Sequence, residues 1–258
     1  MTTGTLNQTF EFMIEGIEFE STAEFIIPSI NLRAKLEKEF PFQLHVQVEN
    51  ATEYEALQHA NDFTRELYFR LLLRFAPVIE LSTAPRPTHQ SFTNSNIPII
   101  ISRNQVISGN SQIIRRRKVL PLSEVDSMAR DVELRVVTPK PVTSTMLYTA
   151  INMYVTGFES SNKVVRFIVF YSALALASLF KSHKGNLSDV DSLMLGVKPA
   201  IRQIISPKTN KNETIYTKFR NDLIHSEERG CDPEKAILEI ENHIKDFQEV
   251  VSLVFQVL

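Results

Sequence analysis

The sequence predicts an α+β protein with an N-terminal mixed α/β domain, residues 1–138, and a C-terminal all-α bundle, residues 143–258. Two patterns lead to this fold class. Residues 42–49 alternate strictly between apolar and polar side chains, as a half-buried strand does, whereas the second half has helical periodicity and no convincing strand. The segment T-P-K-P at 138–141 interrupts both patterns, so we place the domain boundary there.

Composition limits the functions that this chain can have. Its 258 residues are 43% hydrophobic and 22% charged, which suits one large or two small globular domains. The net charge of −2 provides no global basic field, so any contact with RNA must come from a local patch. The single cysteine, Cys231, excludes an intrachain disulfide and a cysteine zinc site. The N-terminus lacks the pattern of a signal peptide, and we expect a cytoplasmic protein.

The N-terminal domain is expected to begin with short strands at 10–19 and 25–32, followed by the clearer strand at 42–49. The sequence T-E-Y-E at 52–55 matches a capping box and predicts a helix that runs to about residue 75. Its expected core face contains Ala56, Ala60, Phe63, Leu67 and Leu71.

Residues 82–96 are rich in Pro, Ser, Thr and Asn and predict a long loop. Further strands are expected at 97–102, 112–120 and 132–137. The second of these contains the densest positive charge in the chain, Arg115, Arg116, Arg117 and Lys118. Two interpretations of this run stay open: a solvated strand edge that discourages aggregation, or a patch that contacts RNA phosphates.

The C-terminal domain is expected to begin with a helix capped by Thr143 or Ser144 and ending near residue 158. Ser161 is the expected cap of the next helix, which is apolar over 164–180 apart from Arg166 and two serines. Seventeen residues with an arginine are marginal for a bilayer, which needs about 20 apolar residues. We therefore expect a buried bundle helix or a dimer interface, and no membrane partner.

Three further segments complete this domain. A helix is expected from Ser188 to about residue 205, with interruptions at Gly196 and Pro199, followed by a polar connector at 206–211. Asp232-Pro233 supplies an N-cap with proline at the first position of the last helix. That helix has a clean apolar seam of Ile237, Ile240, Ile244, Phe247, Val251, Val254 and Leu258.

Between the connector and the last helix, residues 212–230 read as an amphipathic helix capped by Asn212. Its apolar stripe is Ile215, Phe219 and Leu223, and its polar set is Arg220, Asn221, Asp222 and His225. Asn221 and His225 are four residues apart, so their side chains are expected to meet. A cation, an amide and a group that titrates near neutrality would then converge.

The motif R-N-x-x-x-H formed by Arg220, Asn221 and His225 resembles the signature of HEPN domains. These all-α bundles include many metal-independent ribonucleases. The resemblance covers about residues 143–258 and places the motif on the penultimate helix. In one departure, some HEPN nucleases carry an acidic residue on the helix behind the motif, whereas residues 164–183 contain none.

The resemblance implies an endoribonuclease whose composite site forms in a homodimer, with a role in antiviral defence or toxin-like translation arrest. Arg220 would clamp the phosphate, His225 would act as acid or base, and Asn221 would orient His225 or the phosphate. RNA is the expected partner, with a regulatory protein or a nucleotide as a conceivable activator. The histidine spacings match no metal motif and phosphate-loop glycines are absent, so no metal and no cofactor are expected.

A rival interpretation uses the same residues. Lys218 and Asp222 could form an ion pair, Arg220 could meet a surface carboxylate, and His225 could interact with the helix dipole. A second rival is a catalytically silent HEPN-like bundle for dimerisation or for binding a nucleotide or partner protein, in which the motif would act as a recognition patch or as a polar network in the interface. The N-terminal domain would be a sensor or an RNA-docking module under either hypothesis.

Overall fold

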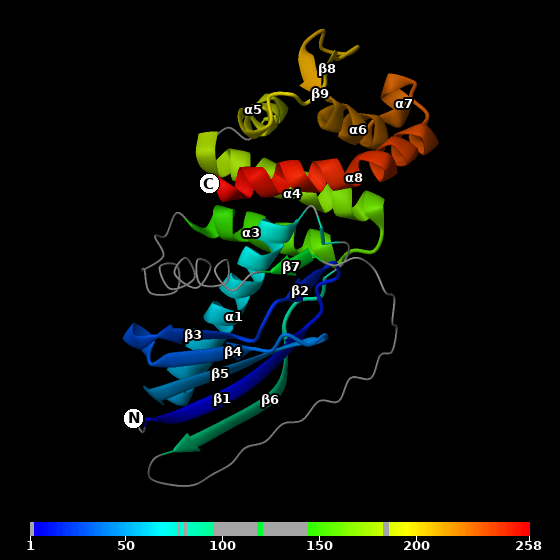
Figure 1. Ribbon diagram of the computed structural model, residues 1–258. Helices are drawn as coiled ribbons and strands as arrows, with labels where there is room; N and C mark the ends of the chain where they lie inside the picture. The colour runs from blue at the N-terminus through cyan, green and yellow to red at the C-terminus, as the bar shows by residue number, and fades with distance from the viewer. Residues whose placement is uncertain (1–2, 77, 80–81, 95–117, 121–143, 183–185) are drawn as a thin grey trace. The chain divides into compact units, whose positions relative to one another are not determined.

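The computed structural model describes residues 3–76, 78–79, 82–94, 118–120, 144–182 and 186–258 (Figure 1). The chain divides into two compact units, Met1–Pro139 and Lys140–Leu258, which we call the sheet unit and the helical unit. The sheet unit contains a five-stranded antiparallel sheet and a long helix, and the helical unit is mainly helical. The predicted α+β class is therefore confirmed.

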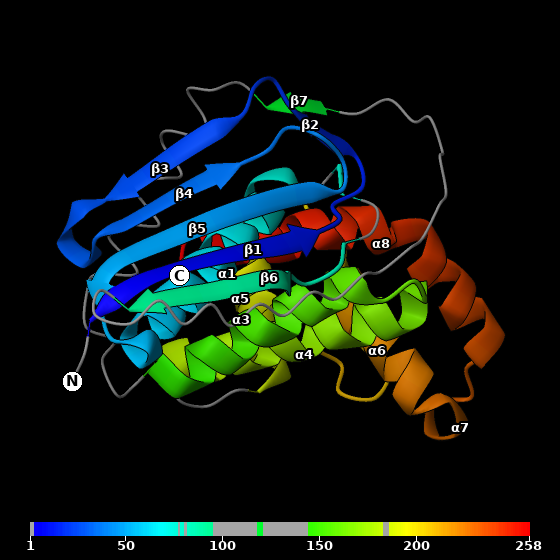
Figure 2. The same cartoon turned by 90° about the horizontal axis from the view of Figure 1, so that it is seen from below.

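The sheet has the strand order β3-β4-β5-β1-β6 (Figure 2). In chain order its strands are β1 (Gly4–Phe12), β3 (Ala23–Ile27), β4 (Leu32–Leu36), β5 (Phe42–Ala51) and β6 (Arg86–Asn94). Strand β5 confirms the alternating pattern, because Phe42, Leu44, Val46 and Val48 are buried. Neighbouring strands are antiparallel throughout, so short turns can connect β3, β4 and β5.

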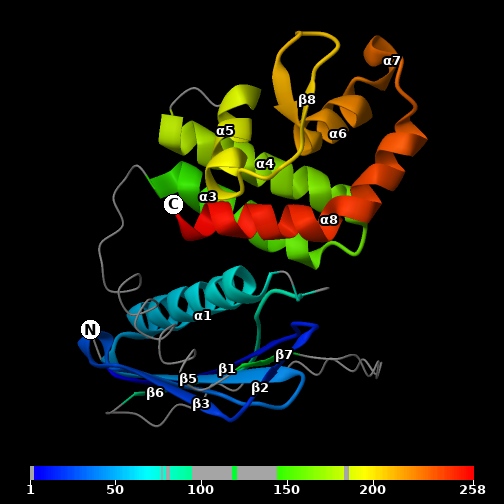
Figure 3. The same ribbon diagram turned by 45° about the horizontal axis from the view of Figure 1, so that its top comes forward.

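Helix α1 (Glu53–Phe75) packs against β1 and β5 and covers one face of the sheet (Figure 3). The predicted capping box is present: Thr52 Oγ1 accepts from the Glu55 amide at 3.3 Å, and Glu55 Oε2 accepts from the Thr52 amide at 3.1 Å. All five predicted core residues, Ala56, Ala60, Phe63, Leu67 and Leu71, are fully buried. The sheet unit thus has its core between α1 and the apolar face of the sheet.

Two predicted strands of the sheet unit are divided in the structure. The apolar stretch 10–19 belongs to β1, which begins at Gly4, and to β2 (Ile17–Phe19), which pairs in parallel with β7 (Lys118–Leu120). The stretch 25–32 is divided by the 3-10 turn Pro28–Ile30 and by Asn31 with φ of 49°. Proline and a left-handed asparagine are turn residues, so they end one strand before the next begins.

The predicted loop at 82–96 is wrong, because β6 lies within it and pairs with β1. The polar composition of β6 gives no alternating apolar pattern, so only its pairing with β1 identifies it as a strand. The β1–β6 register shifts between Thr9 and Phe10, next to Pro87. A proline is tolerated at such an irregularity in an outer strand. The strands expected at 97–102 and 132–137 lie outside the described residues, as does the first part of the strand expected at 112–120.

The helical unit contains α3 (Ser144–Glu159), α4 (Lys163–Ser182), α5 (Leu187–Val197), α6 (Ile215–Ile224), α7 (Ser226–Arg229) and α8 (Pro233–Gln256). Helix α4 packs against α3, α5 and α8 (Figure 3). Two predicted caps are displaced: Asn162 caps α4 in place of Ser161, and Asn186 caps α5 in place of Ser188. In both cases a neighbouring asparagine accepts from backbone amides of the first turn.

Arg166 explains how an arginine fits into the apolar helix α4. It is 6% exposed and donates to the Ser160 carbonyl from Nε at 3.1 Å and Nη2 at 2.7 Å, and to Gln248 Oε1 at 3.0 Å. Burial lowers the pKa of Arg166 from its usual value. Among the described residues, α4 alone is long and apolar enough to span a membrane. Core helices pass the same test, so this is weak evidence for a span.

The helical unit also contains a small hairpin, β8 (Gln203–Ile205) and β9 (Asn212–Thr214). The prediction that this half has no strand is wrong, and α5 ends at Val197 rather than near residue 205. Pro199 disfavours helical backbone at the residue before it, which ends the helix early. The predicted start of α8 is confirmed: Asp232 caps it and Pro233 is its first residue. Its predicted seam is buried except at Ile237 and Leu258.

Candidate functional site

The motif helix α6 is shorter than the sequence predicts. Its N-cap is Thr214, whose Oγ1 accepts from the Thr217 amide at 3.2 Å, and not Asn212. It ends at Ile224, so His225 is the C-cap residue, with φ of −119° and ψ of 33°. The backbone amide of His225 donates to the Asn221 carbonyl at 2.9 Å. The four-residue helix α7 follows, so the expected continuous helix over 212–230 is wrong.

The side chain of Asn221 makes its hydrogen bonds with Glu213 and Arg220 rather than with His225. Asn221 is 4% exposed; its Nδ2 donates to Glu213 Oε2 at 3.1 Å, and its Oδ1 accepts from Arg220 Nη1 at 2.9 Å. A carboxylate only accepts and a guanidinium only donates, so these two partners fix which way the amide points. Asn221 therefore connects Arg220 to a buried acid.

Glu213 in β9 is a site residue that the sequence did not reveal. Its side chain is 7% exposed, which is rare for a glutamate without a bonded partner. In the sequence it reads as an ordinary acid near the start of a helix. The hairpin turns it toward α6, and no local pattern indicates that contact.

A second buried acid forms hydrogen bonds with the first turn of α6 and its N-cap residue. Asp191 of α5 accepts from Thr214 Oγ1 at 2.7 Å and from Thr217 Oγ1 at 2.5 Å. The hydroxyls of Thr217 and Tyr171 of α4 lie 2.7 Å apart. Burial raises the pKa of the Asp191 carboxyl and that of the Tyr171 phenol. Helix α4 carries no acid near the motif, as the sequence indicates, and the acids come from α5 and β9.

The remaining motif residues have mixed surroundings. Asp222 is buried and forms an ion pair with Lys218 one turn earlier, which is the pairing that the rival interpretation expects. Cys231 Sγ lies 3.5 Å from Asp222 Oδ1. Arg220 and His225 are half-buried, so solvent reaches part of each side chain. The motif thus combines a buried scaffold with two partly accessible groups that can bind an anion or transfer a proton.

A cleft of about 550 Å³ lies on another side of α6, between that helix, β8 and α8; we call it the α6–α8 cleft. Its apolar lining residues are Ile204, Ile215, Phe219 and Ala236. Its polar lining residues are Arg202, Lys218, Asp222, Cys231, Asp232, Lys235, Glu239 and His243. Asp222 and Lys218 line this cleft and are not part of the hydrogen-bonded series Glu213–Asn221–Arg220.

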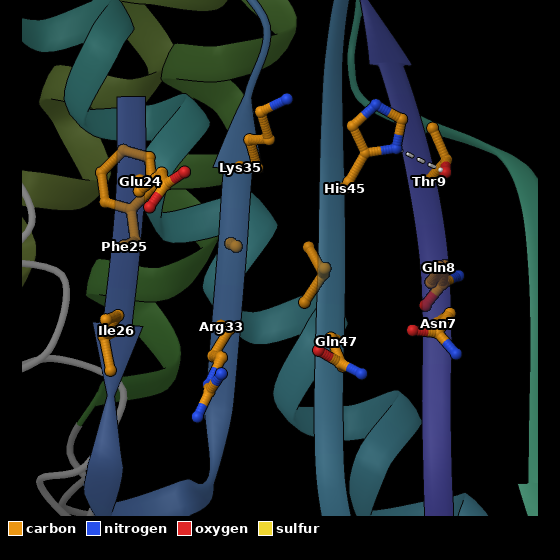
Figure 4. A pocket seen from close by; sticks show the side chains of 12 residues that line it. Asn7, Gln8, Thr9, Glu24, Phe25, Ile26, Arg33, Lys35, His45 and Gln47 are labelled. Atoms are coloured by element: carbon orange, nitrogen blue, oxygen red, sulfur yellow. Dashed lines mark hydrogen bonds between the residues drawn. The ribbon is translucent and has the colours of Figure 1, made fainter. Parts of the chain in front are cut away.

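The sheet unit has a depression of about 440 Å³ over its polar face (Figure 4). Two cross-strand rows line it, one of Ile26, Arg33, Gln47 and Asn7 and the other of Glu24, Lys35, His45 and Thr9. His45 Nδ1 lies 3.0 Å from Thr9 Oγ1, and Lys35 pairs with Glu37 at 2.7 Å. Cations and acids are mixed here, so no ligand class follows from the lining.

Two other predictions concern residues of which little is described. Arg115, Arg116 and Arg117 lie outside the described residues, and of Lys118 only the backbone, in β7, is described. The phosphate-contacting role of this run stays a prediction. Within the described residues, no group of three histidine, cysteine, aspartate or glutamate side chains could hold a metal ion.

Comparisons with protein-family models, curated proteins and solved structures find no match to this chain. The resemblance to HEPN domains therefore stays a prediction. The chemistry of the site has to be argued from the contacts described above.

Proposed function

We propose that this protein is a metal-independent endoribonuclease whose active site forms between two copies of the helical unit. The observation that supports the proposal is the chain of contacts from buried Glu213 through buried Asn221 to half-buried Arg220. Burying a glutamate and an asparagine is costly unless their hydrogen bonds are made. Here both are used to hold one guanidinium, which suggests that the orientation of Arg220 matters.

A guanidinium held in this way is suited to a phosphate. Arginine binds phosphate through two parallel N–H donors, and prior orientation reduces the entropy lost on binding. Among the described residues, Asn221 engages one Nη1 donor of Arg220, and a guanidinium has further N–H groups that can bond to a ligand. Arg220 would bind the scissile phosphate and stabilise the negative charge that grows in the transition state.

His225 would supply the proton transfers. The 2′-hydroxyl of RNA attacks the adjacent phosphorus as one imidazole accepts its proton, and an imidazolium protonates the departing 5′-oxygen. The products are a 2′,3′-cyclic phosphate and a 5′-hydroxyl end. Each chain contributes one such histidine, so a symmetric dimer supplies both the base and the acid.

The surface of α4 supports an assembly of two copies. Val165 and Ile168, one turn apart on this helix, are 47% and 37% exposed. Neighbouring exposed apolar residues on one helix can form part of an interaction surface. A nuclease of this kind fits the antiviral or toxin-like role that the resemblance to HEPN domains implies, and the cytoplasmic location expected from the sequence.

The decisive experiment is cleavage of labelled RNA in the presence of EDTA. His225→Ala should reduce the rate by about 10²–10⁴-fold, the usual effect of losing a positioned acid or base. Arg220→Lys should be nearly as damaging, because lysine lacks the bidentate fork. Asn221→Ala should be milder, because it removes the support of Arg220 and leaves both reacting groups. Products ending in a 3′-hydroxyl, or activity that EDTA abolishes, would contradict the mechanism.

The second candidate is a catalytically silent bundle that binds a nucleotide or a partner protein. Two observations favour it: the ion pair between Lys218 and Asp222, and the burial of Asn221, both of which a structural role explains. Under this hypothesis the three motif substitutions lower the thermal midpoint, and the wild-type protein shows no EDTA-resistant cleavage of any RNA.

A further inference from the structure

The segment that leads into the motif helix carries positive charge with no acid beside it in the sequence. Residues 192–212 contain no aspartate or glutamate, in a chain whose net charge is −2. They contain four cations: Lys198, Arg202, Lys208 and Lys211. The first of these pairs with Glu249 at 3.0 Å, and the other three are exposed and lie in the hairpin β8–β9 or directly before it. The hairpin therefore has a local basic surface that the overall composition conceals.

Backbone hydrogen bonds fix the shape of this hairpin. The Ser206 amide donates to the Lys211 carbonyl at 2.8 Å, and the Asn210 amide donates to the Ser206 carbonyl at 2.9 Å. Asn210 has φ of 53°, a left-handed conformation that asparagine tolerates in turns. The polar connector expected at 206–211 is thus a hydrogen-bonded turn. Such a turn presents its lysines with little further loss of backbone entropy when a ligand binds.

The hairpin is joined to the motif helix and lies beside it (Figures 1 and 3). The amide of Ile215, the first residue of α6, donates to the Arg202 carbonyl at 3.0 Å. Strand β9 supplies Glu213, which accepts from Asn221 of α6 at 3.1 Å. The basic surface and the motif helix therefore belong to one hydrogen-bonded substructure, and a ligand that extends from Arg220 has the hairpin as a neighbour.

The exposed side of the hairpin matches a phosphodiester backbone. Arg202 and Lys211 have no side-chain partner within the part of the chain that the structure describes. The acid of β9, Glu213, is 7% exposed and bonded to Asn221, so it does not offset these charges at the surface. The exposed residues Thr209, Asn210 and Asn212 add hydroxyl and amide donors, which proteins use on phosphate oxygens together with arginine and lysine.

The tip of the hairpin is less suited to other anionic partners. Residues 207–212 have the sequence P-K-T-N-K-N and contain no large apolar side chain. Membrane-surface segments combine cations with apolar residues that enter the lipid, and protein interfaces concentrate aromatic and apolar residues at their centre. A nucleic-acid backbone needs only charge and hydrogen-bond donors.

We propose that the hairpin β8–β9 is the surface of the helical unit that binds the phosphate backbone of RNA. This proposal rests on the proposed nuclease function and concerns residues distinct from the run at 115–118. Arg202, Lys208 and Lys211 would contact phosphates of a strand whose scissile phosphate lies at Arg220. These contacts would raise the affinity for RNA of any base sequence and take no part in the chemistry.

The test is fluorescence anisotropy with a short labelled single-stranded RNA. The full chain carries His225→Ala and the buffer contains EDTA, so that the RNA stays intact. The hairpin variant Arg202→Gln/Lys208→Gln/Lys211→Gln should weaken binding at least tenfold. The slope of log affinity against log salt should flatten by about 2, because each phosphate contact with a single strand contributes about 0.7.

The matched control is Lys163→Gln/Lys181→Gln/Lys245→Gln, which removes three exposed lysines of α4 and α8 and should leave the affinity and the slope unchanged. Circular dichroism shows whether each variant is folded. If the hairpin variant unfolds, Arg202→Gln/Lys211→Gln should still flatten the slope by about 1.4. With His225 intact, the hairpin variant should raise KM for RNA cleavage and leave kcat unchanged, as expected for a loss of uniform binding.

The proposal is overturned if the hairpin variant binds RNA as tightly as its parent, or if the control variant loses as much affinity. It is also overturned if the hairpin variant loses binding only to vesicles that contain phosphatidylserine, or if the parent protein binds no RNA. Hairpin-dependent RNA binding by a protein that cleaves no RNA would support this proposal and refute the proposed nuclease function.

Discussion

At the residue scale, the buried amide of Asn221 determines how an accessible charge is presented. Its Nδ2 is 3.1 Å from Glu213 Oε2, and its Oδ1 is 2.9 Å from Arg220 Nη1. Neither hydrogen bond can form if the amide oxygen and nitrogen exchange places, because a guanidinium cannot accept and a carboxylate cannot donate. Replacing the amide nitrogen by oxygen therefore has a defined effect. That makes the network testable by substitution.

Asn221→Asp places a second carboxylate against buried Glu213 and removes the donor between them. We expect the free energy of unfolding to fall by about 2 kcal/mol or more, since Glu213 Oε2 loses the amide donor and faces a like charge in a buried position. Adding Glu213→Gln reverses donor and acceptor and restores both hydrogen bonds, so the double variant should recover most of the loss. Urea unfolding of the two single variants and the double variant measures this coupling. Additive single effects would contradict the network.

Asp191 should give a pH-dependent contribution to stability. Burial, and to a lesser extent Glu213, raises its pKa in the folded state, while Thr217 and Thr214 oppose the shift. Its protonated form therefore stabilises the fold below the unfolded-state pKa, and this contribution is lost as the pH rises through the folded-state pKa. Asp191→Asn keeps the accepting oxygen and removes the titration. Its thermal midpoint, relative to wild type, should rise between pH 4 and 7; a constant difference would contradict the prediction.

At the scale of elements, Arg166 connects the end of α3 to α4 and α8. It makes three hydrogen bonds, two to the Ser160 carbonyl and one to Gln248. Arg166→Met keeps the apolar stem and removes these three hydrogen bonds, so the free energy of unfolding should fall by about 2–3 kcal/mol. Arg166→Lys should cost less, because it retains one donor group. Chemical denaturation measures both variants, and equal stability of methionine and wild type would show that the contacts are dispensable.

The elements that the sequence predicted are those whose signals are local. Strand β5 has a strict two-residue period, and α1 has both halves of its capping box within four residues. Strand β6 and the hairpin β8–β9 were missed because only their pairing with another strand, and no pattern within their own residues, identifies them as strands. The hairpin strands have three residues each, too few to show a period, and β6 is polar and contains Pro87.

The local structure of the candidate site was predicted in part for the same reason. Arg220 and Asn221 lie on a helix as their spacing predicts, whereas His225 is the C-cap residue and not part of a continuous helix. Their role as a site stays a prediction. The partners of Asn221 could not be predicted, because Glu213 reaches it through the hairpin and not through helical spacing. Asp191 lies on α5, and only packing brings it to Thr214 and Thr217.

At the scale of the whole molecule, the proposed composite site would require two chains. Val165→Glu/Ile168→Glu places charges on the exposed apolar positions of α4 and should prevent association at micromolar concentration. Sedimentation velocity should show a dimer for wild type and a monomer for this variant, with RNA cleavage lost together with the dimer. Leu238→Glu, at a residue of α8 that is 58% exposed, is the matched control and should remain dimeric. A monomeric wild-type protein would contradict the composite site.

Helix α6 has a thermodynamic consequence as a wall shared by two sites. Its ten residues contribute Arg220 to the proposed nuclease site and Lys218, Phe219 and Asp222 to the α6–α8 cleft. If a ligand in the cleft shifts this helix, the change in affinity is reciprocal: that ligand would alter RNA binding at the proposed nuclease site by the same factor by which RNA alters the binding of the ligand. The concentration of such a ligand would then set the fraction of protein competent to bind RNA.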